Sequence, residues 1–531
     1  MTTRDRKVRI YDLHSWTGIA LGLFVYVVSF TGCLALFYHE IHSWEDPAKR
    51  LTVPDAPVAL QPHLDAWVDE TAAGHEVTFV LVQYPSTYEP YFFARLNTKD
   101  ADGHTDSFTR RWDPATGVVL PERGEGLATW LLDFHRDLMW PDELGGRQIG
   151  RSIVGVAGII LMLSILTGVI THSKMMRELF TLRYLRSVRL KWQDTHKVIG
   201  LWGLPFYAMI SFTGAFLGVI ALLLPIMAAI VVKGDTDKLL AALGNEPPER
   251  TGAATRMITV DEVGAMRHAQ TGNAPSGVFI TNWGDETAIY QVNYEAASKL
   301  VSFDAVTISG VTGQPTTGNA FLEPAVVNRV LSAITPLHYG TYGGIALKVL
   351  YLVLGLSLCA VTALGLMMWI ERRLHGNEGR KSEAFYRRLS RFTVGVTAGV
   401  AVASVALFYH DKLYTGAESA RLVWTGWTYF LVWAVVVAYA MWRTNDYRTT
   451  RDLTALTGLG LIGLPLLNGL ATGDFFLSGL AGANPVTAWV DVSFLVLGAI
   501  TCTLAAALPS HRPEAVAATT DTTHAHAAPA E

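Results

Sequence analysis

The sequence predicts a polytopic α-helical membrane protein with eight transmembrane helices and two small α+β domains outside the membrane. Half of the 531 residues are apolar and only 17% are charged. The apolar residues are concentrated in long runs. A bilayer core of roughly 30 Å needs about 20 apolar residues per helix. Eight runs reach that length without the alternation of barrel strands: about 13–42, 148–172, 197–228, 343–370, 392–410, 422–442, 453–472 and 486–508.

The composition also excludes several classes of protein. Charge is too scarce and the net charge of −4 too low for a nucleic-acid binder, so membrane lipid is the expected environment. The 3 cysteines, Cys33, Cys359 and Cys502, all fall inside predicted helices. A buried thiol usually acts as a small hydrophobic group, so no disulfide framework is expected.

Basic residues set the orientation of the predicted helices. Lys and Arg number 4 before the first helix, 6 in 173–192 and 7 in 371–391, whereas the short opposite loops 411–421 and 473–485 carry 2 and 0. The positive-inside rule therefore places both termini in the cytoplasm of a bacterial inner membrane. The first helix has no small-residue cleavage site after it and is expected to remain as an anchor.

These helices and the segments between them divide the chain into eight parts. Each outer segment has the pattern of one helix followed by three strands: a helix near 62–74 with strands at 77–84, 90–97 and 108–120, and a helix from Thr259 with strands at 277–283, 288–295 and 300–313. The parts are the N-terminus with the first helix (1–42), the first periplasmic domain (43–146), two helices with a cytoplasmic loop (147–228), the second periplasmic domain (229–342), the fourth helix (343–371), a basic cytoplasmic loop (372–391), an accessory bundle of four helices (392–508) and a disordered cytoplasmic tail (509–531).

The first four helices contain an internal repeat. At an offset of 182, His14 matches His196, and the sequence Ser-Phe-Thr-Gly recurs at 29–32 and 211–214. Glycines also match: Gly18 with Gly200 at that offset, and Gly158 with Gly355 and Gly168 with Gly365 at an offset of 197. The unit is helix, outer domain, helix, used twice in the same orientation. This is typical of a parallel repeat with its axis near the membrane normal.

Histidines near the helix ends are the candidate functional residues. Ionisable residues at membrane depth are costly and often mark a function, although a single histidine is also easily accommodated at the interface by a bond to a backbone carbonyl. Neutral imidazole is an axial ligand of haem iron. The candidates are His14, His172 and His196 on the cytoplasmic side and His39, His135 and His338 on the outer side.

The repeat predicts how these histidines pair. His14 with His196 and His135 with His338 are the symmetric pairs, and each pair predicts one haem. His172 is the alternative inner ligand, and His39 is the alternative outer one. His14 and His39 are expected in one helix, 25 residues and about 37 Å apart, so they cannot share a haem. The four glycines at 18, 32, 200 and 214 are expected to allow close approach by a flat macrocycle or a neighbouring helix.

Four motifs in order resemble the PepSY-associated transmembrane family. They are LHSWTGIALGLFVYVVSFTG, LLDFHRDL with GIILMLSILTGVITH, THKVIGLWGLPFYAMISFTG, and PLHYGTYGG leading into LGLMMWIERR. The resemblance covers about residues 9–373 and implies two b-type haems, PepSY-like outer domains and reduction of ferric siderophores. The family's histidines carry over to His14, His135, His172, His196 and His338. The four helices of the accessory bundle depart from the shorter family pattern.

The leading hypothesis is therefore a di-haem inner-membrane reductase. It would pass electrons from a cytoplasmic reductase or a quinol to a periplasmic ferric siderophore, with haem iron as its only metal and no catalytic residue yet named. One alternative is a membrane haem oxidoreductase whose partner is a redox protein. Another is a PepSY membrane protein without enzymatic activity that binds a peptide or regulates a protease.

Overall fold

The structure is a computed structural model that describes most of the chain between residues 3 and 512. The expected tail from residue 513 onwards, most of the predicted cytoplasmic loop 173–192 and the segment 376–380 of the basic loop lie outside the described residues. The other undescribed positions are 56, 73, 87, 101, 235–247, 272–274, 295–299, 301–304, 317–325 and 481–484.

Seven described helices are long and apolar enough to cross a membrane. They are α1 (Thr3–Ala35), α5 (Gly146–Thr171), α11 (Gly344–His375), α12 (Glu383–Leu413), α13 (Arg421–Trp442), α14 (Asp446–Thr472) and α16 (Val486–Ala507). An eighth span is formed if α6 (Val188–Trp202) and α7 (Leu204–Val231), which bend by 68° at Gly203, count as one. The predicted class, a polytopic helical membrane protein, is thereby confirmed.

The first predicted helix, 13–42, is two helices in the structure. α1 ends at Ala35, and α2 covers Tyr38–Glu45. The break occurs where the backbone bonding tightens, because Leu36 N–H bonds to Gly32 O four residues back but Phe37 N–H bonds to Leu34 O only three back. The apolar run continues through this break and conceals it. The expectation that His14 and His39 share one helix is therefore wrong.

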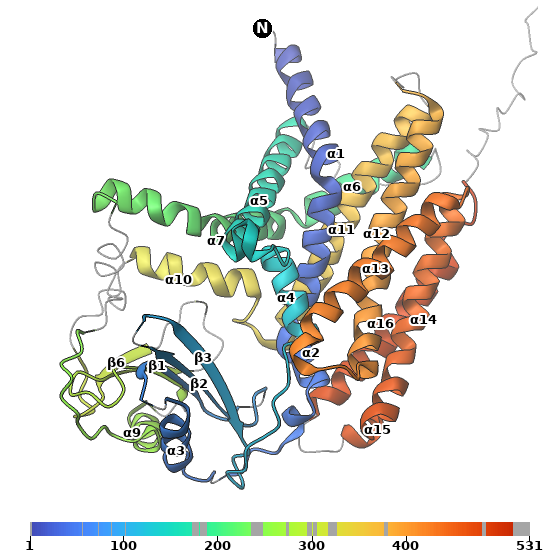
Figure 1. The fold of residues 1–531 in the computed structure, drawn as a ribbon. Coiled ribbons are helices and arrows are strands. Elements are labelled where there is room, and N and C mark those ends of the chain that lie inside the picture. The colour runs from blue at the N-terminus through green and yellow to red at the C-terminus, as the bar shows by residue number, and fades with distance from the viewer. Residues whose placement is uncertain are drawn as a thin grey trace, which may run out of the picture.

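The two outer segments form one antiparallel sheet of six strands in the order β3-β2-β1-β4-β5-β6 (Figure 1). Strands β1 and β4, one from each segment, pair in the middle with Val80 opposite Ile280. The order therefore reads the same from either edge, as a twofold repeat requires. The strands are β1 (Glu76–Gln83), β2 (Phe92–Lys99), β3 (Thr105–Trp112), β4 (Pro275–Thr281), β5 (Ile289–Tyr294) and β6 (Ala305–Ser309).

The two helices of this sheet domain begin by capping one another. Asp261 of α9 (Val260–Thr271) accepts the N–H groups of Leu60 and Gln61 at 3.0 and 2.9 Å, at the start of α3 (Gln61–Ala72). The Gln61 side chain in turn accepts the N–H of Val260 at 2.8 Å. These bonds satisfy donors that a helix N-terminus leaves free. The two expected α+β units thus share one core and are described below as the sheet domain.

The remaining elements connect the sheet domain to the long helices. Figure 1 shows α10 between the sheet and α7, α4 beside α1, and the N-terminus of α1 at the end of the bundle away from the sheet. These elements are η1 (Pro47–Arg50), α4 (Leu127–Asp137), η2 (Asp142–Leu144), α10 (Val326–Tyr339), η5 (Glu418–Ala420) and α15 (Phe476–Gly479).

The predicted accessory bundle packs directly against α2 and α4. On α4, the ring of Trp130 lies 4.5 Å from that of Tyr429 in α13, centroid to centroid. On α2, the indole N–H of Trp44 donates to Asp491 of α16 at 2.7 Å. Asp491 also accepts from the side-chain amide of Asn468 in α14 at 2.9 Å, so this fully buried carboxylate is well satisfied. Helices α12 to α16 therefore form a wall that holds α2 and α4 in place.

The start of α4 depends on a side chain from α2. Gly126, the residue before the helix, provides no side-chain cap. Instead, Glu45 accepts the N–H of Ala128 at 3.1 Å. Burial, assisted by the nearby Asp411, raises the pKa of Glu45 to about 8. The start of α4 is thus fixed by a carboxyl group of α2 and not by a side chain of its own N-terminal residue.

We expect Asp261→Ala to destabilise the start of α3, because two backbone donors lose their acceptor. A lost cap costs about 1–2 kcal/mol, so amide exchange in the first turn of α3 should quicken by about tenfold or more. Hydrogen exchange with mass spectrometry on the full-length protein measures this. Asp65→Ala is the control, since the hydrogen bond that the structure describes for Asp65 comes from the side-chain amide of Gln61 and not from a backbone N–H at the start of α3. Equal exchange in the two variants would contradict the proposed cap.

Candidate functional site

The structure brings the repeat-related histidines together in two pairs. His135 of α4 and His338 of α10 form the sheet-side pair, with ring centroids 6.2 Å apart and ring planes 19° from parallel. His14 of α1 and His196 of α6 form the N-terminal-side pair, with centroids 6.4 Å apart and planes at 71°. Each pair joins one residue from each half of the repeat, as the sequence predicted.

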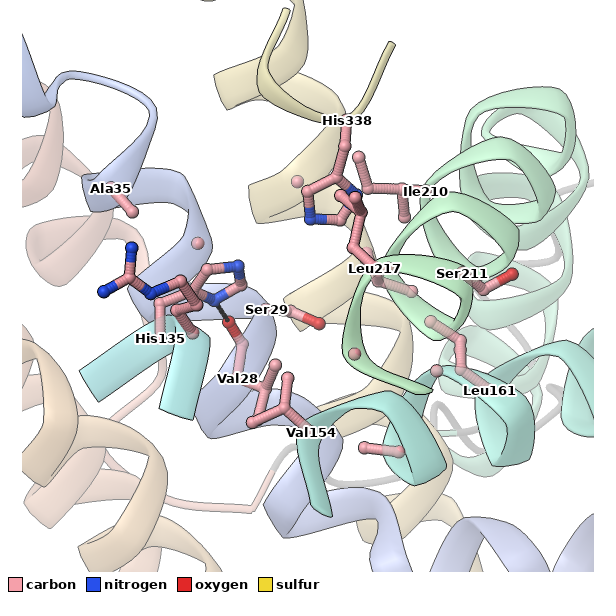
Figure 2. Close-up of a pocket in the computed structure, with 18 of the residues that line it drawn as sticks. Val28, Ser29, Ala35, His135, Val154, Leu161, Ile210, Ser211, Leu217 and His338 are labelled. Atoms are coloured by element: carbon pink, nitrogen blue, oxygen red, sulfur yellow. Dashed lines mark hydrogen bonds between the residues drawn. The ribbon is translucent and has the colours of Figure 1, made fainter. Parts of the chain in front are cut away.

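The sheet-side pair opens into a cavity of about 280 Å³ among α1, α4, α5, α7, α10 and α11. Figure 2 shows both imidazole rings turned toward this space. Its walls are mainly apolar, with side chains that include Val28, Val154, Leu161, Ile210 and Leu217. A mainly apolar cavity with a few convergent polar groups is the usual form of a ligand or cofactor site.

Each ring of the sheet-side pair is held by its Nδ1 atom. His135 Nδ1 lies 2.9 Å from the backbone oxygen of Val28, which can only accept, so Nδ1 carries the proton. His338 Nδ1 lies 2.9 Å from Thr213 Oγ1. The Thr213 hydroxyl donates to Met209 O at 2.8 Å, so it accepts from His338. Apolar surroundings disfavour a charged imidazolium, and a neutral ring with Nδ1–H has its free lone pair on Nε2.

The N-terminal-side pair is held in the same way. His14 Nδ1 lies 2.9 Å from Ser164 O of α5, and His196 Nδ1 lies 2.9 Å from Val361 O of α11. Residues 164 and 361 are themselves related by the repeat offset of 197. Both rings therefore donate to a carbonyl of the neighbouring helix and keep Nε2 available as a ligand atom.

Glycines of the repeat allow the rings to approach the helices this closely. A Cβ atom at Gly32 would lie 2.7 Å from Cε1 of His135, and one at Gly214 would lie 3.0 Å from Cε1 of His338. On the other pair, a Cβ at Gly168 would lie 3.3 Å from Cε1 of His14. A side chain at these positions would displace the imidazoles.

The other two glycines predicted to allow close approach behave differently. A Cβ atom at Gly18 or Gly200 would meet nothing within 4 Å. The first residue lies on α1 and the second on α6, each four positions beyond a histidine of the N-terminal-side pair. These glycines face open space and not a neighbouring helix.

The two sites follow one another along the bundle. On α5, Gly158 lines the sheet-side cavity and Gly168 contacts His14. On α11, Gly355 and Gly365 occupy the equivalent places. Ten residues of helix span about 15 Å. The two sites are therefore separated by about 15 Å along these helices.

The alternative ligands lie outside the two ring pairs. His39, on α2, packs against the rings of Tyr38 and Tyr88 with centroids 5.2 and 5.4 Å away. His172 is the residue after the end of α5, and its backbone N–H bonds to Val169 O. The rings that face each other at the two sites belong to the repeat-related histidines. Neither His39 nor His172 is a member of these two pairs.

Some residues of the sheet-side site have little or no signal in the sequence. Thr213 stands out only as part of the repeated Ser-Phe-Thr-Gly motif. Arg136 and Arg151 also line the cavity, but only Arg136 lies in a quoted motif, LLDFHRDL, where the neighbouring His135 was the predicted ligand. Their role becomes visible only when the six helices are assembled.

The fold and the site define a polytopic membrane protein with two symmetry-related histidine pairs inside one helical bundle. The chain belongs to the PepSY-associated TM region family, which matches residues 11–372. It is also 27% identical, over 329 residues, to an uncharacterized protein of Pseudomonas aeruginosa, and the similarity covers 59% of this chain and 81% of that protein. The resemblance seen in the motifs is confirmed. The family match ends within α11, before α12 to α16.

We expect Thr213→Val to lower the free energy of unfolding by about 1–2 kcal/mol more than Thr31→Val. Thr213 accepts the Nδ1–H of His338, whereas the described bonds of its repeat counterpart Thr31 stay within its own helix, to Val27 O and Val28 O. Valine keeps the branched shape and removes the hydroxyl. Thermal unfolding of the purified protein in detergent measures the difference. If both variants lose the same stability, the His338 bond is of no consequence.

Proposed function

We propose that this protein is an inner-membrane reductase that holds two haem b groups and delivers electrons to a ferric siderophore in the periplasm. The observation that carries the proposal is the pair of histidine sites. Each has two neutral imidazoles facing each other with Nε2 unoccupied by the fold, and the two sites stand at successive depths of one bundle.

The geometry of both pairs fits a haem iron. Two imidazoles that held one metal ion through Nε2, each about 2 Å from it, would have ring centroids roughly 6 Å apart. The observed separations are 6.2 and 6.4 Å. A porphyrin supplies the other four iron ligands, so two histidines complete the coordination.

Haem in these sites would supply reversible one-electron transfer. The chain's own residues perform the remaining tasks. Carbonyls of neighbouring helices hold Nδ1–H, fix the ring orientation and increase the basicity of Nε2. The apolar walls of the sheet-side cavity exclude water and so influence the reduction potential. Gly18 and Gly200 leave open space beside the N-terminal-side pair, which suits a flat macrocycle.

The distribution of basic residues supports the direction of transfer. The loops on the side of the N-terminus are rich in Lys and Arg, which favours a cytoplasmic location for that side and a periplasmic one for the sheet domain. The electron donor would be a cytoplasmic reductase or a quinol. Siderophores hold Fe(III) through hard oxygen ligands, and one-electron reduction weakens that binding. Fe(II) would then be released for uptake with the chelator intact.

The first test is the absorption spectrum and haem content of the purified protein. We expect a Soret band, a dithionite-dependent α band and two haems per chain. His135→Ala and His338→Ala should each lose one haem, and His14→Ala and His196→Ala should each lose the other, because one histidine of each pair is removed. Protein without a Soret band would end the haem proposal.

His39→Ala and His172→Ala are the controls for these assignments. His39 lies near the sheet-side end of the bundle and His172 near the other end. Neither ring belongs to one of the two histidine pairs. We expect both variants to retain two haems. Loss of one haem in either control, with full content in the matching pair variant, would reassign that ligand.

The second test addresses the substrate. Prereduced protein is mixed anaerobically with ferric hydroxamate and ferric catecholate chelates, and reoxidation is followed at the α band. We expect reoxidation coupled to the appearance of Fe(II), trapped by ferrozine, with one Fe(II) formed per electron lost. The reductase proposal fails if the haems stay reduced with every chelate. Rapid reoxidation by a redox protein instead would favour the alternative oxidoreductase.

A further inference from the structure

An arginine without a counter-ion lines the sheet-side cavity. Arg151 lies on α5 near the end that adjoins the sheet domain, and its side chain contributes to the cavity wall. Its Nε atom is buried and makes no hydrogen bond. Within the part of the chain that the structure describes, no carboxylate pairs with it. A cation in mainly apolar surroundings is costly unless a partner neutralises it.

The nearby acidic groups are already used by other arginines. Asp133 accepts from Arg136 at 2.5 Å and from Arg147 at 2.6 Å. Asp137 lies 3.5 Å from the Nε atom of each of the same two arginines. Arg136 and Arg147 therefore share these two carboxylates, and neither carboxylate pairs with Arg151.

The repeat shows that this lack of a counter-ion is specific to one half. The residue equivalent to Arg151, at the offset of 197, is Lys348 of α11. Lys348 has a counter-ion, because its Nζ lies 2.7 Å from Glu40, and it also lies over the ring of Phe37. It is not part of the cavity wall. The fold thus neutralises the cation in one half, whereas the cation of the other half lines the cavity that His135 and His338 also line.

We propose that Arg151 binds a carboxylate of the ligand in the sheet-side cavity, namely a propionate of the haem held by His135 and His338. Arg136 lines the same cavity, but its guanidinium already pairs with Asp133. The planar guanidinium matches a carboxylate with two parallel hydrogen bonds. This inference rests on the proposed haem function and adds to it a residue that anchors and tunes one of the two haems. Arg151 is in this sense a positioning residue.

The test compares Arg151→Gln and Arg151→Lys with wild-type protein, and Lys348→Gln is the control at the equivalent position of the repeat. Haem loss to excess apomyoglobin and the midpoint potentials of both haems are measured in detergent. We expect Arg151→Gln to release one haem at least about tenfold faster and to lower one midpoint potential, since a nearby positive charge favours the reduced state. Arg151→Lys should lie between wild type and Arg151→Gln, and Lys348→Gln should match wild type.

A second arm identifies the carboxylate by changing the haem in wild-type protein before the variant is compared. Wild-type protein is reconstituted with haem or with haem dimethyl ester, whose propionates carry no charge. We expect the ester to reproduce the faster loss of one haem, and Arg151→Gln to add nothing further to the ester-loaded protein. An additional effect of Arg151→Gln with the ester would show that Arg151 does not act through a propionate.

Further outcomes distinguish a failure of this inference from a failure of the proposed function. If wild-type protein holds two haems but Arg151→Gln changes neither retention nor potential, this inference is wrong while the haem proposal stands. The same conclusion holds if Arg151→Gln only weakens reoxidation by an anionic chelate such as ferric citrate, which would place the anion on the substrate. Protein that binds no haem would overturn the proposed function itself.

Discussion

The hydrogen bond from a buried imidazole to the neighbouring helix is the constraint on which the rest of this structure depends. A ring nitrogen inside a helical bundle must find a partner, because an unsatisfied polar group there is costly. Three of the four rings use a backbone carbonyl and the fourth uses Thr213. Each bond ties two helices together, fixes which nitrogen carries the proton and turns the other toward the interior.

Glycines determine how close those helices can be. With ring atoms only about 3 Å from the position of a missing Cβ, even alanine at Gly32 or Gly214 would displace His135 or His338. The same small residues that usually serve close helix packing in membranes here make room for imidazoles. The histidines and the glycines of the repeat therefore form one arrangement.

The sheet domain completes the symmetry outside the helices. Its central pair, β1 and β4, joins the two halves, and the reciprocal caps of Gln61 and Asp261 join the helices that cover it. The two halves of the repeat nevertheless differ near the sheet-side cavity. The wall of α12 to α16 packs on α4, where the ring of Trp130 contacts that of Tyr429. Among the described residues no carboxylate pairs with Arg151, whereas its equivalent Lys348 pairs with Glu40.

The sequence by itself determined the membrane class, the number of long apolar segments, the strands of the outer segments and the pairing of His14 with His196 and of His135 with His338. Periodicity and internal repetition are local or pairwise properties, so they can be read from the chain directly. The end of α1 before His39 and the bend at Gly203 were not visible, because apolar residues continue across both. Only the tertiary structure decided that two outer units share one sheet, that Thr213 and carbonyls hold the rings, and that Arg151 faces the cavity. These contacts join residues far apart in the chain, and their existence depends on how the helices pack.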